Sequence, residues 1–129
     1  MAQILIADDD PMVVKLVEFK LAKRGHKITV AADGKTALDM ARQNKPDLIL
    51  LDSMMPGMDG FEVLRRLKKA VDTSDIPVVM LTARRREQDI VDELKLGARE
   101  YLVKPFMPEE LSTRIEAILA ASKDSKKIA

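Results

Sequence analysis

The sequence has no cysteine and no tryptophan, and aromatic residues make up only 3% of its 129 residues. Without cysteine, neither a disulfide framework nor a thiolate metal site can form, which fits a cytoplasmic protein. So few aromatic side chains argue against the base-stacking platforms of proteins that bind single-stranded nucleic acid. The charges are nearly balanced, with 22 Lys and Arg against 21 Asp and Glu, which argues against the basic surface of a dedicated nucleic-acid binder.

Long apolar runs are also missing. None approaches the ~18 residues that a membrane-spanning helix needs, so no membrane span is expected. No signal peptide precedes the first strand-like segment, and we therefore expect a cytoplasmic location. The length fits one domain, and a hydrophobic content of 47% suffices for one sizeable core.

What the chain does contain is a regular alternation of short apolar runs and helical patterns. The apolar runs predict five buried parallel strands, at about residues 3–7, 27–31, 47–51, 76–81 and 100–103. Helical periodicity predicts five helices, at about residues 11–24, 34–43, 59–70, 87–96 and 108–121. This order predicts a doubly wound parallel α/β sheet covered on both faces. Right-handed crossovers then bring the carboxyl ends of all the strands to one edge of the sheet.

Polar or charged side chains end four of the predicted strands, at the edge where a parallel α/β sheet places its chemistry. In chain order they are Asp8, Asp9 and Asp10, then Asp52, then Thr82, and last Lys104. Asp10 precedes Pro11 and is interpreted as a helix cap. Crowded carboxylates raise one another's pKa, and Mg²⁺ relieves the repulsion because it prefers a few carboxylates plus waters. We therefore expect Asp8, Asp9 and Asp52 to form a metal site.

The other polar residues leave alternatives open. Lys104 could neutralise a carboxylate or hold a phosphoryl oxygen as a point charge, and the Lys104–Pro105 peptide bond could be cis. Thr82 could be an ordinary β-branched strand residue, or its hydroxyl could donate to an anion bound at Asp52. His26, which is the only histidine, is interpreted as a solvated loop residue.

Five motifs in order complete the pattern, and they occupy residues 4–10, 47–52, 55–60, 81–83 and 97–106. Together, over about residues 2–121, they resemble the receiver domain of two-component response regulators of the chemotaxis type. The resemblance implies a flavodoxin-like (βα)5 fold with strand order 2-1-3-4-5. It leaves residues 122–129 as a polar C-terminal tail or the start of a linker.

The resemblance implies that Asp52 accepts a phosphoryl group from the phosphohistidine of a histidine kinase or of a histidine phosphotransfer protein. Asp9, Asp52 and the backbone carbonyl of Met54 would bind Mg²⁺ directly, and Asp8 would act through water. Lys104 would bind a phosphoryl oxygen once Asp52 is modified. Such a domain catalyses only its own phosphorylation and dephosphorylation, so an enzyme acting on a separate substrate is not expected. Phosphoryl transfer needs positioning and charge neutralisation more than covalent machinery, which agrees with these residues.

A second group of residues would carry the signal away from the site. The resemblance implies that Thr82 and the backbone N–H of Ala83 also bind the phosphoryl group, and that Tyr101 turns inward as Thr82 moves. The output surface would be formed by the helix at about 87–96, the strand at 100–103 and the helix at 108–121. A downstream protein would bind there, with no nucleic acid and no membrane as partners of this chain.

We expect a monomer, because Ile90 stands where related dimers carry a basic residue; a phosphorylation-dependent dimer is the alternative. The charges on the output surface that could pair across such a dimer, or onto a partner helix, are Lys95, Glu100, Glu110 and Arg114. The run Arg84-Arg85-Arg86 is interpreted as a solvated helix start that could also bind acidic partners. Arg84 itself would shield the acyl phosphate from water.

Three other functions are alternatives. The chain could be a receiver module from a longer DNA-binding or enzymatic regulator. A Mg²⁺-dependent aspartyl-phosphate hydrolase would need a second carboxylate two positions after its nucleophile, where this chain has Met54. A flavin-binding module would need a phosphate loop after the first strand, where Asp8, Asp9 and Asp10 would repel a phosphate.

Overall fold

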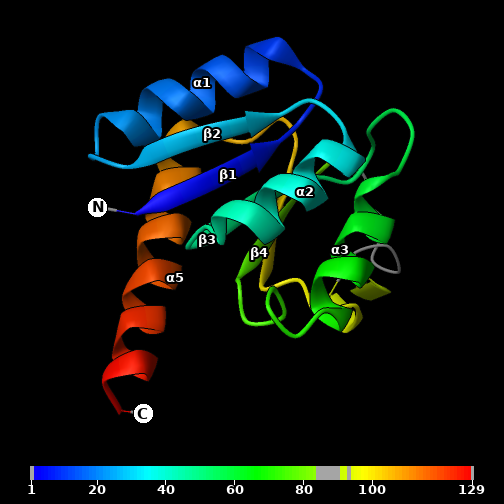
Figure 1. Cartoon of the computed structure of the whole chain (residues 1–129). Coiled ribbons are helices and arrows are strands. Elements are labelled where there is room, and N and C mark those ends of the chain that lie inside the picture. Colours follow the sequence, from blue (N-terminus) through cyan, green and yellow to red (C-terminus); the bar gives the residue numbers. More distant parts are fainter. Residues whose placement is uncertain (1, 84–90, 93, 129) are drawn as a thin grey trace.

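The computed structural model describes residues 2–83, 91–92 and 94–128, with side chains described up to residue 122. Five strands form one parallel sheet in the order β2-β1-β3-β4-β5 (Figure 1). This confirms the predicted doubly wound fold and its strand order. The strands are β1 (Gln3–Ala7), β2 (Lys27–Ala31), β3 (Leu48–Asp52), β4 (Val78–Thr82) and β5 (Glu100–Val103). The helices are α1 (Pro11–Ala22), α2 (Gly34–Asn44), α3 (Gly60–Lys69) and α5 (Pro108–Ile128).

The element boundaries differ from the predicted ones most clearly in β3, β4 and α5. Strands β3 and β4 end at Asp52 and Thr82, so both of these functional candidates are the last residues of strands. Strand β4 begins at Val78, after Pro77, which has no N–H to donate to a ladder. Helix α5 continues to Ile128, past the predicted end near residue 121, because neither glycine nor proline follows Pro108 in the sequence.

Half of the fourth predicted helix, at about residues 87–96, falls outside the described residues. Residues 91, 92, 94 and 95 are helical, whereas the interpretations placed on Arg84–Arg86 and on Ile90 lie outside the described part of the chain. Within that part, no helix is long and apolar enough to cross a membrane.

The sheet has a hydrophobic core on each face, because side chains along a strand alternate between the two faces. On one face, Leu5, Ile49, Leu51 and Met80 pack against α2 and α3. On the other, Ile4, Ile6, Leu50 and Leu81 pack against α1 and α5. The apolar runs of β1, β3 and β4 are therefore buried on both sides, which holds the carboxyl ends of these strands in fixed positions at one edge.

Two local interpretations have different outcomes. Asp10 is the N-cap of α1, since its side chain accepts a hydrogen bond from the Met12 N–H at 2.9 Å, so the predicted cap is confirmed. The interpretation of His26 as a solvated residue is wrong, because its side chain is buried. Its Nδ1 accepts from the Ala2 N–H at 3.2 Å and its Nε2 lies 2.6 Å from Glu116 Oε1. Helix α5 supplies Glu116 from 90 residues away, which local sequence around His26 does not show.

Ser112 provides a test of the packing on the α1 and α5 face. Its side chain is fully buried, and its Oγ has no hydrogen-bond partner among the described residues. Because an unsatisfied buried hydroxyl destabilises the folded state, Ser112→Ala should raise the free energy of unfolding by about 1 kcal/mol, measured by urea denaturation. Thr113→Ala, at an exposed neighbouring position, reports the change in helix propensity alone. A loss of stability in Ser112→Ala would show that the hydroxyl has a favourable contact.

Candidate functional site

Three carboxylates converge at the carboxyl edge of the sheet. Asp8 and Asp9 follow β1, Asp52 ends β3, and a carboxylate oxygen from each lies within 4.8 Å of the others. Asp8 and Asp52 are buried, whereas Asp9 is exposed. The neighbouring strands β1 and β3 run in register, with Ala7 opposite Leu51, which is why the next residues, Asp8 and Asp52, come together.

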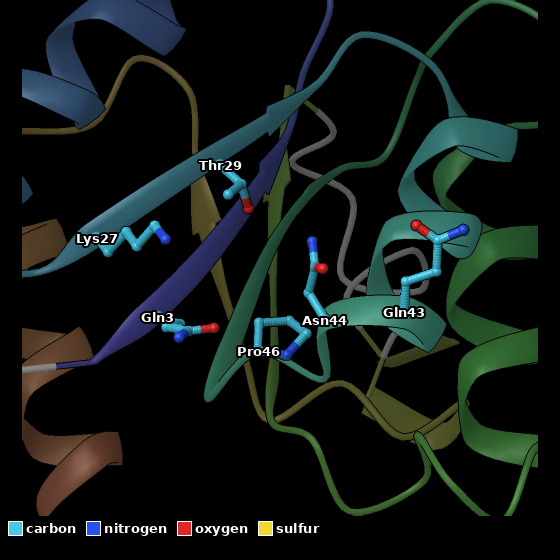
Figure 2. A pocket seen from close by; sticks show the side chains of 6 residues that line it. All are labelled: Gln3, Lys27, Thr29, Gln43, Asn44 and Pro46. Atoms are coloured by element: carbon cyan, nitrogen blue, oxygen red, sulfur yellow. The ribbon is translucent and has the colours of Figure 1, made fainter.

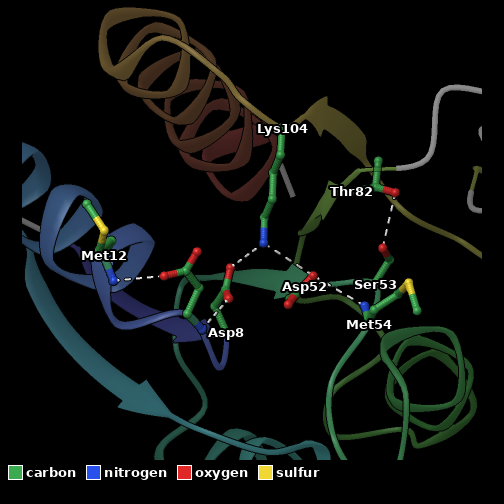
Figure 3. Close-up of polar contacts among 8 residues, drawn as sticks. Asp8, Met12, Asp52, Ser53, Met54, Thr82 and Lys104 are labelled. Carbon is green, nitrogen blue, oxygen red and sulfur yellow. Dashed lines mark hydrogen bonds and ion pairs between the residues drawn. The ribbon is translucent and has the colours of Figure 1, made fainter.

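Lys104 enters this group from the end of β5 (Figure 3). Its Nζ donates to Asp8 Oδ2 at 2.9 Å and lies 3.4 Å from Asp52 Oδ1. The Lys104–Pro105 peptide is cis, as the sequence allowed. Burial by itself lowers the pKa of Lys104, but the hydrogen bond and charge of Asp8 and the charge of Asp52 outweigh burial and hold the pKa above its usual value. Lys104 is therefore a firmly charged ammonium.

One ammonium does not neutralise three carboxylates. Burial, with the charge of Asp8 in addition, raises the pKa of Asp52 to about 6, although the Met54 N–H and Lys104 both act to lower it. The site therefore carries excess negative charge that a hard cation can balance.

The donor set fits Mg²⁺, because carboxylate and carbonyl oxygens are its preferred protein ligands. Asp8, Asp9 and Asp52 supply the carboxylates. The Met54 N–H donates to Asp52 Oδ1 at 3.2 Å, and the Met54 side chain is 61% exposed. A thioether is a soft ligand that does not suit Mg²⁺, so the backbone carbonyl is the group that Met54 can offer.

Thr82 lies on the other side of the strand end. It follows Met80 by two positions along β4, so its side chain belongs to the face covered by α2 and α3. It is 0% exposed, and its Oγ1 accepts a hydrogen bond from Ser53 Oγ at 3.1 Å. Figure 3 shows Ser53 and Thr82 turned toward each other, while Lys104 reaches toward Asp8 and Asp52. The contact between Ser53 and Thr82 was not predicted from the sequence.

The two remaining predicted residues lie near Thr82. Tyr101 is partly buried and packs against the core on the α2 and α3 face. Ala83 directly follows β4 and is exposed. The phosphoryl-binding role of Ala83 and the switching role of Tyr101 stay predictions.

Two hollows lie on the surface, one beside the site and one at the opposite edge of the sheet. One of about 310 Å³ lies beside Lys104 and is otherwise lined by Asp10, Val13, Leu16, Pro105 and Phe106. The other, of about 370 Å³, lies at the amino ends of β1 and β2 (Figure 2). Its lining residues are Gln3, Lys27, Thr29, Gln43, Asn44 and Pro46. This set includes no carboxylate and no histidine to act as a general base, so the chemistry belongs to the opposite edge of the sheet.

The sequence matches the family model of the response regulator receiver domain over residues 4–116. It is 43% identical to Protein PilH of Pseudomonas aeruginosa, over 93% of this chain and 99% of that protein. It is 41% identical to transcriptional regulatory protein AfsQ1 of Streptomyces coelicolor, over 92% of this chain and 52% of AfsQ1. The chain spans about half the length of several curated relatives that it matches. The receiver domain of the Francisella response regulator 1452 superposes with a TM-score of 0.89 at 34% identity, covering 95% of this chain and 99% of that domain.

The raised pKa of Asp52 gives a pH-dependent prediction for the metal-free protein. A carboxyl whose pKa is higher in the folded state favours folding when protonated, and that contribution is lost as the pH rises from about 4 to about 6. Asp52→Asn should therefore raise the free energy of unfolding by roughly 1–3 kcal/mol at pH 8 and by much less at pH 4, measured by urea denaturation with a chelator present. The exposed Asp72→Asn serves as the control. An equal gain for Asp52→Asn at both pH values would contradict the charge argument.

Proposed function

Since the chain belongs to the family of response regulator receiver domains of two-component systems, we propose that it is a phospho-accepting switch whose acceptor is Asp52. The observation that carries this proposal is the buried Asp52 carboxylate, 3.4 Å from the ammonium of Lys104 and clustered with Asp8 and Asp9. The phosphoryl donor would be a phosphohistidine on a histidine kinase or on a histidine phosphotransfer protein.

In the proposed reaction, an Asp52 carboxylate oxygen attacks phosphorus while the bond from phosphorus to the imidazole nitrogen breaks. The electron pair of that bond leaves with the histidine, and Asp52 becomes an acyl phosphate. Lys104, already paired with Asp8, neutralises charge that builds on the phosphoryl oxygens. Asp9, Asp52 and the Met54 carbonyl would hold Mg²⁺, with Asp8 acting through water, and the ion would supply charge neutralisation.

The proposed output surface is the one around β5 and α5. Thr82 and the Ala83 N–H would bind the phosphoryl group, and Tyr101 would turn inward as Thr82 moves. Glu100 and Arg114, two of the charges considered for pairing across a dimer, instead form an ion pair with each other inside the chain. Such internal pairing leaves fewer charges for a symmetric dimer and supports the proposal of a monomer that binds a downstream protein.

Whether the chain works alone or within a longer regulator stays part of the proposal. Protein PilH is matched over nearly its whole length, whereas AfsQ1 is about twice as long as the match. We favour a signalling switch over a hydrolase, because Met54 occupies the position where such a hydrolase carries its second carboxylate. A switch catalyses only its own phosphorylation and dephosphorylation, and we propose that it does so in the cytoplasm, where such kinases hold their phosphohistidine.

The acceptor is tested by intact mass after incubation with acetyl phosphate and Mg²⁺. The wild-type protein should gain one phosphoryl group, and Asp52→Asn should gain none, because an amide oxygen is a poor nucleophile for this transfer. Asp59→Asn, which changes a carboxylate that caps α3 outside the site, should still gain the group. A full adduct on Asp52→Asn would falsify the assignment.

The metal ligands are tested by thermal unfolding with and without Mg²⁺. A ligand of the native state raises its stability, so the wild-type melting temperature should rise when Mg²⁺ is added. Asp9→Ala should abolish most of that rise, because Asp9 is the exposed carboxylate available for direct ligation. Asp8→Ala should weaken the rise less, since Asp8 is held by Lys104. An unchanged Mg²⁺ response in Asp9→Ala would remove Asp9 from the metal site.

A further inference from the structure

Ser53 is held rigidly by its own backbone. Its N–H donates to the Leu81 carbonyl at 3.0 Å, and its carbonyl accepts from the Gly60 N–H at 3.1 Å. Gly60 lies in close contact with the backbone of Asp52 and Ser53, since a Cβ at position 60 would lie 2.1 Å from the Asp52 carbonyl oxygen. Ser53 is 1% exposed. The start of α3 and strand β4 thus hold the backbone of this residue on both sides, and its buried hydroxyl donates from a restrained position.

That hydroxyl points at Thr82, whose backbone is equally restrained. The Thr82 carbonyl accepts from the Lys104 N–H at 2.7 Å, and Ser53 Oγ donates to Thr82 Oγ1 at 3.1 Å. With both backbones fixed, rotation of the Thr82 side chain is the simplest way to bring its hydroxyl toward Asp52. Because Asp52 and Thr82 belong to opposite faces of the sheet, that rotation takes Thr82 Oγ1 away from Ser53.

We propose that Ser53 is a positioning residue that holds the Thr82 hydroxyl in its resting place and so sets how readily a phosphoryl group at Asp52 recruits it. This inference rests on the proposed function, in which Thr82 binds the phosphoryl group. Recruitment then requires the Ser53–Thr82 hydrogen bond to break and leaves the Ser53 hydroxyl buried without that acceptor. Both effects oppose recruitment, and both disappear when Ser53 is replaced by alanine.

The size of the effect follows from the bond that is broken. One hydrogen bond between neutral groups shifts an equilibrium about two- to tenfold. A ligand at Asp52 that recruits Thr82 should therefore bind Ser53→Ala about two- to tenfold more tightly than wild type. In this proposal, Mg²⁺ alone makes no contact with Thr82. The affinity for Mg²⁺ should therefore be the same in wild type and in Ser53→Ala.

The probe is beryllofluoride with Mg²⁺, which mimics a phosphoryl group on Asp52. The affinity is measured by titration, and amide NMR follows Thr82 and Tyr101. In ligand-free Ser53→Ala, the signals of both residues should move part of the way toward their ligand-bound positions, because the resting population has shifted. If the substitution only disturbed local packing, these signals would not move along the line that joins their ligand-free and ligand-bound positions.

Two further variants make the test specific. Ser112→Ala removes a buried hydroxyl from the opposite face of the sheet and should leave beryllofluoride affinity unchanged. In a Thr82→Ala background, Ser53→Ala should have no further effect, because the hydrogen bond is already gone. A gain that persists without the Thr82 hydroxyl would overturn the inference, as would equal affinities in wild type and Ser53→Ala. Failure of the wild-type protein to bind beryllofluoride at all would instead reject the proposed function.

Discussion

The site depends on one electrostatic conflict, which is the burial of Asp8 and Asp52 beside each other with Asp9 close by. Lys104 stabilises this arrangement, since its ammonium donates to Asp8 and lies 3.4 Å from Asp52. It does not fully offset the conflict, because burial and the charge of Asp8 still raise the pKa of Asp52 to about 6. A site with unbalanced negative charge binds cations in its resting form. In the proposed function, the response of the site to a phosphoryl group is therefore set by Lys104 and by any bound cation together.

The pleat of the sheet divides the functional residues into two groups. Asp8 and Asp52 continue the side of Ile6 and Leu50, which packs on α1 and α5. Ser53 and Thr82 continue the other side, which packs on α2 and α3 and against which Tyr101 also lies. The charged residues are thus separated from the hydroxyl groups of Ser53 and Thr82, because the two groups lie on opposite faces of the sheet. A change at Asp52 reaches the second group only if a side chain crosses that edge, and Thr82, the last residue of β4, is placed to do so.

Apolar runs and strand-end carboxylates are local patterns, and they were sufficient to predict a parallel sheet and the cluster at its carboxyl edge. The strand order was predicted from the resemblance to receiver domains. It was not sufficient for contacts whose partners come from distant elements. The hydrogen bond from Ser53 to Thr82 joins residues 29 positions apart, and the contact between His26 and Glu116 joins residues 90 positions apart. A serine directly after β3 could have suggested a partner on β4, since the alternation of side chains places both hydroxyls on one face.

The contrast between the core and the edge explains how the proposed switch would act without unfolding the domain. Both faces of the sheet are closed by buried aliphatic side chains, so the backbones of β1, β3 and β4 have little freedom to respond to charge. The unfavourable electrostatics are confined to the last residue of a strand and the two residues that follow it. A change of charge at Asp52 is therefore relieved by the parts that can move at low cost, which are side-chain rotamers such as that of Thr82 rather than strands. The free-energy change of such a side-chain rearrangement is of the order of a few hydrogen bonds. It is small compared with the free energy of the packing that holds the sheet together.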